Sequence, residues 1–269
     1  MKKKKGITLW IGIIFVSFLF LMMLISFVYI PYDVNDMNIA NRLQGPSLSN
    51  WLGTDNFGRD ILSRVMEGSK TAIAVGAVSV GIGLVGGVII GALAGYIGKW
   101  VDEVFMRLID ALMAFPGIML ALILVTLFKP SLFQTMIAIG VLSIPTFARV
   151  SRSGFLQLKE AEFVKAARGI GAGHLTIVRR HIVPNMISSI VVTASLSFST
   201  SILIEAALSY LGLGVQPPDP SWGSMLNESQ SYMSKAPWFT LAPGIIITIT
   251  VLGFNLLGDG IRDLRDSRT

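Results

Sequence analysis

The sequence predicts an all-α integral membrane protein with six transmembrane helices. Of its 269 residues, 52% are hydrophobic and only 14% are charged, and the mean hydropathy is +0.67. Soluble domains carry about 25% charged residues, so this composition is typical of membrane proteins. Six apolar stretches are each long enough, at about 1.5 Å per helical residue, to cross a hydrocarbon core of ~30 Å.

The first apolar stretch runs from Gly6 to Ile30 and follows the lysines at positions 2–5. A secretory signal also begins with basic residues, but its apolar region has about 7–15 residues and precedes a small-residue cleavage site. This stretch is longer and ends at Pro31-Tyr-Asp33. We therefore interpret residues 1–31 as an N-terminal tail and a first membrane helix that stays in the protein.

Residues 32–70 are polar and rich in turn-forming residues, and they predict a long loop outside the membrane. Within it, Asp55, Arg59 and Asp60 are close enough in sequence to form local ion pairs. We interpret this region as a rigid folded loop, with a ligand-binding loop as the alternative. The core of the protein is then expected to occupy residues 71–269.

The second apolar stretch, residues 71–96, carries small residues at every fourth position. A spacing of four places them on one face of a helix, where another helix can approach closely. Static close packing is the favoured interpretation, and a sliding or rocking surface is the alternative. The residues of this face are Ser79, Gly83, Gly87, Gly91 and Gly95.

The third stretch, residues 104–128, is interrupted by Phe115-Pro116-Gly117. Proline inside a helix removes a backbone hydrogen bond, so a kink is expected at this point. Asp110 follows Arg107 by three residues, and the two are expected to pair. The fourth stretch covers residues 132–150.

Residues 160–184 form a polar segment in an otherwise apolar chain. Phe163, Ala167 and Ile170 follow a helical period, and a second period begins at His174, after glycines at 171 and 173. Two short amphipathic helices with a basic face are therefore expected. Such a pair is suited to docking on a protein partner, although it could also lie flat on anionic lipid.

Pro184 begins the fifth stretch, which continues over residues 187–211. It contains Glu205, a carboxylate within an apolar run and therefore a functional candidate. A structural pair with Arg64 or Lys70 is equally compatible with its position near the outer interface. A short helix is expected at about 224–233, and the last stretch covers residues 239–257.

Six spans place both termini on the same side of the membrane. Most of the 22 lysines and arginines then lie on that side, together with the 160–184 segment, and the positive-inside rule makes it the cytoplasmic side. The six basic residues on the outer side are Arg42, Arg59, Arg64, Lys70, Lys129 and Lys235.

The spacing in the 160–184 segment resembles a loop of ABC-importer permeases. That loop reads Glu-Ala-Ala, three residues, Gly, nine residues, Ile-x-Leu-Pro. This chain has Ala166-Ala167, Gly171 and His181-Ile182-Val183-Pro184 in the same register. It departs from the family pattern in that Lys165 replaces the Glu, His181 the Ile and Val183 the Leu.

Three further segments resemble the peptide/opine/nickel group of these permeases, so the resemblance extends over nearly the whole chain. They are Leu52-Gly-Thr-Asp-Asn-Phe-Gly-Arg-Asp60, the run from Ser209 to Gly223, and Asn255-Leu-Leu-Gly-Asp-Gly-Ile-Arg-Asp263. The resemblance implies a type I ABC-importer permease fold with cytoplasmic termini in a bacterial cell membrane.

The resemblance also implies partners. The chain would pair with a second homologous permease, with two cytoplasmic ATPase subunits that bind ATP and Mg, and with an extracellular or periplasmic solute-binding protein. It would itself bind no cofactor. The contact with the ATPases would be made by the matching residues Lys165, Ala166, Ala167, Gly171, His181, Ile182 and Pro184.

Several chemistries are not supported by the sequence. It has no Gly-x-x-x-x-Gly-Lys-Ser/Thr motif for ATP phosphates, no cysteine, and no His, Asp or Glu cluster with metal-ligand spacing. Its basic residues lie at the ends of spans, where lipid and topology explain them better than nucleic acid does. No enzymatic site is expected.

The predicted function is that of a permease subunit that forms half of a pathway for short peptides. Nickel or a metal chelate is the alternative cargo. An ion-coupled secondary carrier is the alternative from another class, but it would call for inverted repeats and charges at mid-membrane, which the sequence does not display. A membrane-surface scaffold would not need glycine-lined, kinked spans.

Overall fold

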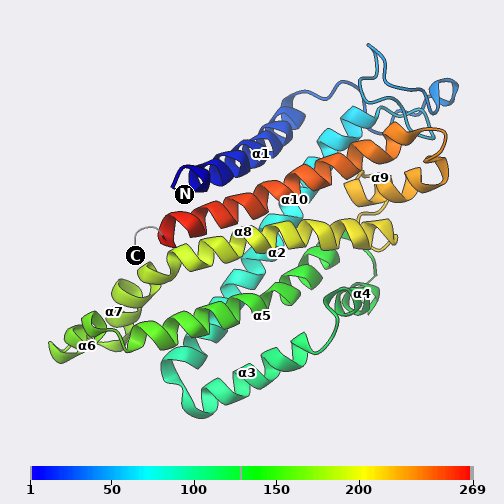
Figure 1. Cartoon of the computed structure of the whole chain (residues 1–269). Helices are drawn as coiled ribbons and strands as arrows, with labels where there is room; N and C mark the ends of the chain where they lie inside the picture. The colour runs from blue at the N-terminus through cyan, green and yellow to red at the C-terminus, as the bar shows by residue number, and fades with distance from the viewer. Residues whose placement is uncertain (1, 128, 267–269) are drawn as a thin grey trace.

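Long helices running roughly along one axis make up the protein, as Figure 1 shows. The computed structural model describes residues 2–127 and 129–266. In this part of the chain, five helices are long and apolar enough to cross a membrane, and a sixth crossing results if one bent pair of helices is counted as a single span. The all-α membrane fold predicted from the sequence is therefore confirmed.

The long helices are α1 (Lys2–Val28), α2 (Ile61–Ile97), α5 (Leu132–Lys159), α8 (Val183–Tyr210) and α10 (Pro237–Asp266). The intervening helices are α3 (Lys99–Met113), α4 (Gly117–Leu127), α6 (Glu162–Gly169), α7 (His174–Ile177) and α9 (Trp222–Ser229). Short 3₁₀ turns occupy Ile39–Asn41 and Gln230–Tyr232, and a π-helical turn, Val178–Ile182, joins α7 to α8.

The third predicted span is broken into α3 and α4, which meet at an angle of 88°. The break lies at Phe115 and Pro116, where the proline ring cannot continue the helical hydrogen bonds. The expected pairing of Asp110 with Arg107 is wrong. Asp110 instead pairs with Arg149 of the neighbouring helix α5, at 2.6 Å, and Arg107 pairs with Glu103 one turn earlier.

Helix α2 begins at Ile61, so its outer part lies within the segment expected to be loop up to residue 70. Asp60 caps this helix: its carboxylate accepts hydrogen bonds from the Ser63 backbone N–H at 2.8 Å and from Ser63 Oγ at 2.7 Å. A side-chain cap satisfies backbone donors that the first turn leaves free. The apolar pattern alone did not reveal this polar first turn.

Helices α2 and α5 pack closely along the small-residue face of α2. A Cβ at Gly87 would lie 2.8 Å from the backbone nitrogen of Ala148, and one at Gly91 would lie 2.6 Å from Ser151 Cβ. Both positions leave no room for a side chain without moving α5. Gly83 and Gly95 face α5 in the same way.

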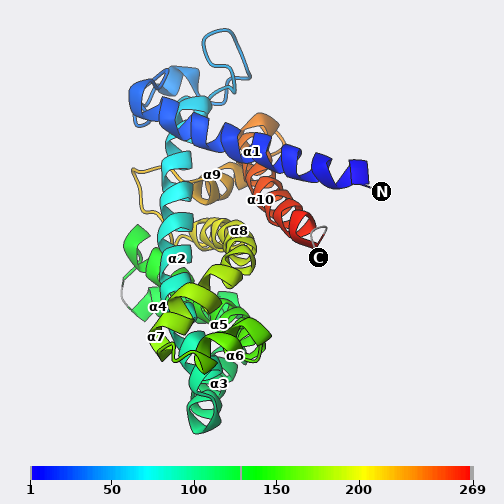
Figure 2. The same ribbon diagram turned by 90° about the vertical axis from the view of Figure 1, so that its left-hand side faces the viewer.

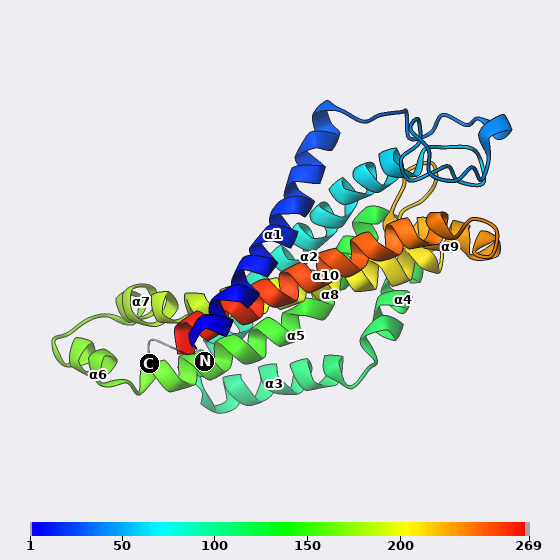
Figure 3. The same ribbon diagram turned by 45° about the horizontal axis from the view of Figure 1, so that its top comes forward.

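The two ends of the molecule differ in character. Figures 1 and 3 place both ends of the chain and the α6–α7 segment at one end, with the 29–60 loop and α9 at the other. Helix α1 packs along α10, and Figure 2 shows it crossing near the outer end of α2. With the positive-inside topology, the end that carries α6 and α7 is cytoplasmic.

Candidate functional site

The 160–184 segment forms a cytoplasmic projection between α5 and α8. Helices α6 and α7 are joined by a turn in which Gly171 has a φ of +87°, a conformation that L side chains rarely adopt. The turn is closed by hydrogen bonds from Gly171 N–H to the Arg168 carbonyl and from Ala172 N–H to the Ala167 carbonyl, both 3.0 Å. The predicted pair of short helices with a glycine turn is present.

The inner face of this projection packs on the ends of the long helices. Val164, Ile177 and Ile182 are buried there against Phe155 of α5 and Met186 of α8. A hydrogen bond also holds this region: Tyr96 Oη of α2 lies 2.7 Å from His174 Nδ1 of α7. The base of the projection is therefore attached to three long helices.

The outer face of the projection carries exposed apolar side chains among basic ones. Ile170 is 88% exposed, Leu175 is 70% exposed and Phe163 is 44% exposed. Of the three residues in the expected helical period, Phe163 and Ile170 are thus exposed and Ala167 is buried, because α6 packs on α5 through Val164. The basic residues Lys165, Arg168, Arg179 and Arg180 are all exposed around them.

The seven residues expected to contact a partner do not share one surface. Lys165, Ala166, Gly171 and Pro184 are exposed, whereas Ala167 and Ile182 are buried and His181 is half-buried. The ring of His181 lies against that of Phe163, with 6.3 Å between their centroids. Ala167 and Ile182 thus support the projection from beneath, and the exposed four remain available for contact.

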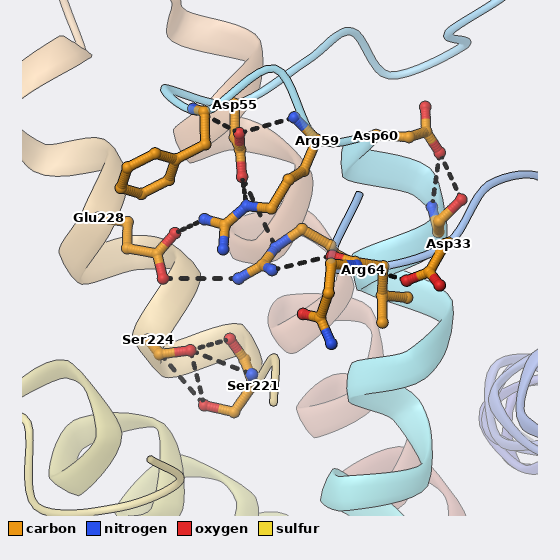
Figure 4. Close-up of polar contacts among 12 residues, drawn as sticks. Asp33, Asp55, Arg59, Asp60, Arg64, Ser221, Ser224 and Glu228 are labelled. Atoms are coloured by element: carbon orange, nitrogen blue, oxygen red, sulfur yellow. Dashed lines mark hydrogen bonds and ion pairs between the residues drawn. The ribbon is translucent and has the colours of Figure 1, made fainter. Parts of the chain in front are cut away.

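The opposite end of the molecule holds a cluster of four charged residues from two distant segments (Figure 4). Arg59 pairs with Asp55 at 2.5 Å and with Glu228 of α9 at 2.6 Å. Arg64 lies between the same two carboxylates, 3.7 Å from Asp55 and 3.5 Å from Glu228. We call Asp55, Arg59, Arg64 and Glu228 the outer ion cluster.

Three members of the outer ion cluster are almost completely buried; only Glu228 keeps some exposure, at 24% of its side chain. The local pair of Asp55 with Arg59 was expected, whereas Asp60 serves as a helix cap. The participation of Glu228 was not foreseen, since α9 has no sequence pattern that relates it to the 53–64 region. The cluster fixes the outer loop to α9.

Glu205 is buried in α8, with 1% of its surface exposed. It accepts a hydrogen bond of 2.6 Å from Ser209 Oγ, and Ser221, which caps α9, is a second side-chain partner. The expected pair with Arg64 or Lys70 is wrong: Arg64 belongs to the outer ion cluster, and Lys70 pairs with Glu67 at 2.7 Å. Glu205 therefore connects α8 to the start of α9.

Metal coordination is not supported in the part of the chain that the structure describes. No group of three or more His, Cys, Asp or Glu side chains is placed to hold a metal ion there. The arrangement is that of a membrane-embedded helical body with the α6–α7 projection at its cytoplasmic end and the outer loop joined to α9 at its outer end.

Known proteins with similar sequences are transport proteins. Residues 87–269 match the family described as binding-protein-dependent transport system inner membrane component. The chain is 41% identical to the dipeptide transport system permease protein DppC of Alkalihalophilus pseudofirmus, over 98% of this chain and 87% of that protein. It is 44% identical to the glutathione transport system permease protein GsiD of Pectobacterium atrosepticum, over 93% and 85% of the two chains.

A solved structure has a similar fold. A chain of the MetNI methionine ABC transporter superposes with a TM-score of 0.62, covering 75% of this chain and 95% of that one. At 18% sequence identity, this similarity concerns the fold alone.

Proposed function

The chain belongs to the family of binding-protein-dependent transport system inner membrane components, and we propose that it carries short peptides across the membrane with energy received through its 160–184 segment. It is a multi-pass permease subunit of an ATP-binding-cassette importer and not an enzyme. The names of its relatives, a dipeptide and a glutathione permease, support peptide-like cargo.

The observation that carries the energy-coupling proposal is the outer face of the cytoplasmic projection. Ile170 and Leu175 are large apolar residues that point away from the protein at the end where ATP is available. Exposed apolar groups within a polar rim are typical of protein contacts. We assign this face to the cytoplasmic ATPase subunits, which would hold the ATP and Mg.

The proposal includes two further kinds of partner, because one permease subunit forms only half of a pathway. A second homologous permease would complete the passage, and a solute-binding protein would deliver cargo to the outer loop and α9. Because α2 and α5 are interlocked along the glycine face, they would move as one body when the projection is displaced. This rigid-body movement would open the passage alternately to the two sides.

The test uses Ile170→Glu, which places a charge at the centre of the proposed contact without affecting a buried side chain. ATPase subunits should no longer co-purify with this variant, and uptake of labelled di- and tripeptides should fall to background. Met233→Glu, at a residue that is 54% exposed at the outer end, should keep the ATPases bound. Full ATPase retention by Ile170→Glu would refute the coupling assignment, and uptake of nickel but not peptides would refute the cargo.

A further inference from the structure

An apolar groove lies beside the crossing of α1 and α2, beneath the outer loop. Its volume is about 690 Å³. Residues from all three segments line it, chiefly Phe18, Leu21 and Ile25 of α1, Leu62 and Met66 of α2, and Trp51 of the loop. None of these residues takes part in the proposed coupling surface, so the groove requires an explanation of its own.

The groove offers no free charge to a polar ligand. Asp60 is the one charged residue among the described residues that line it, and both of its carboxylate oxygens are already used. Oδ1 accepts a hydrogen bond of 2.8 Å from Asn50 Nδ2, while Oδ2 accepts those of Ser63 in the cap of α2. A peptide or a cation would therefore lose its hydration without gaining a partner, whereas a hydrocarbon would lose nothing.

The position of the groove matches the outer half of a bilayer. Phe18, Leu21 and Ile25 belong to the outer half of α1, and their exposed sides continue the exposed apolar surface of that helix. Tyr29, Tyr32 and Trp51, which belong to the outer loop between α1 and α2, also line the groove. Aromatic residues of this kind are enriched where the hydrocarbon core meets the headgroups.

The size of the groove favours the thinner of the two apolar occupants that a membrane offers. A helix with its side chains is about 10–12 Å wide, so 690 Å³ would hold only ~9 Å of it, fewer than two turns. A single acyl chain is thinner than a helix and can follow the groove along α1. We propose that this groove binds one acyl chain of an outer-leaflet phospholipid, in continuity with the surrounding bilayer.

The first experiment measures lipid retention by native mass spectrometry. The protein, with the subunits that accompany it, is extracted from vesicles of phosphatidylethanolamine and phosphatidylglycerol into mild detergent. Wild type should keep one phospholipid per chain, and Ile25→Trp, which fills the groove, should reduce that fraction several-fold. Leu24→Trp is the matched control, because Leu24 is the preceding residue, is 57% exposed and does not line the groove.

The second experiment does not depend on the folding of a variant. A phospholipid with a diazirine at the middle of one acyl chain is photoactivated in the same vesicles with wild-type protein. Labelling of Leu62 and Met66, which lie inside the groove, is expected alongside labelling of exposed residues such as Leu24. Labelling of Leu24 without Leu62 or Met66, or equal lipid retention by the two tryptophan variants, would overturn the proposal. So would capture of the second permease by a photocrosslinking residue at Ile25.

Discussion

Arg59 Nη2 lies 2.6 Å from Glu228 Oε2, although 169 residues separate the two in the sequence. Through this contact the outer loop that precedes α2 is joined to α9, which lies between α8 and α10. Asp55 of the same loop and Arg64 of the first turn of α2 complete the outer ion cluster. Because three of its members are almost completely buried, loss of one charge leaves the others without compensation.

Glu228→Gln should therefore destabilise the protein by about 1–3 kcal/mol, less than for a fully buried partner because Glu228 keeps some exposure. Thermal unfolding of the purified protein in detergent measures the loss. The control is Glu103→Gln, which breaks a pair whose side chains are 61% and 77% exposed and should leave the unfolding temperature unchanged. Equal unfolding temperatures for the two variants would contradict a stabilising role of the cluster.

Gly87→Leu should destabilise the α2–α5 contact, since overpacking of this kind costs about 1–3 kcal/mol. Gly81→Leu is the matched control, because a Cβ at Gly81 on the same helix meets nothing within 4 Å. Gly76, although outside the four-residue series, is not a neutral site, because its Cβ would clash with the Phe198 ring. If Gly81→Leu unfolds at as low a temperature as Gly87→Leu, close packing does not explain the glycine face.

Gly171→Val should weaken the attachment of ATPase subunits while leaving membrane insertion intact. The positive φ of Gly171 costs a residue with a side chain about 1–2 kcal/mol, although a Cβ there would touch nothing. Co-purification of ATPases and peptide uptake are the measurements. Gly169→Val adds the same side chain, also in open space, at a residue without a positive φ, and it should behave like wild type. Equal behaviour of the two variants would argue against a conformational requirement at the turn.

Glu205→Gln should retain transport, whereas Glu205→Ala should lose stability. Gln can still accept the hydrogen bond from Ser209, while Ala leaves that hydroxyl and Ser221 without their buried partner, at a cost of about 1–3 kcal/mol. Peptide uptake and thermal unfolding distinguish the two effects. A changed cargo preference in a stable Glu205→Gln protein would show that this carboxylate reaches the pathway.

The topology can be tested with single cysteines, because the chain has none of its own. Cysteines at Leu48, which is 99% exposed, and at the exposed Ser234 should react with a membrane-impermeant thiol reagent in intact cells. A cysteine at the exposed Arg168 should react only after the membrane is opened. Labelling of the Arg168 position from outside would overturn the assignment of the projection to the cytoplasm.

The sequence by itself determined the helical membrane architecture, the break at Pro116, the glycine face of α2 and the helix pair at 160–184. These features depend on local properties: apolar length, a missing N–H, a four-residue repeat and a glycine turn between two short periodic segments. Each can be recognised within a few helical turns of chain. The excess of lysine and arginine on one side of the predicted spans then gave the orientation of these features in the membrane.

Only the tertiary structure showed which residues the charged side chains pair with and which face of α6 is buried. Glu228 reaches Arg59, and Asp110 reaches Arg149, across distances in sequence that no local pattern encodes. Helix α6 packs on α5 through Val164, which the sequence pattern did not single out, and this packing leaves Ile170 exposed. The contacts of a buried charge or apolar side chain depend on which helices pack around it. That packing depends on the whole chain and not on a local stretch of sequence.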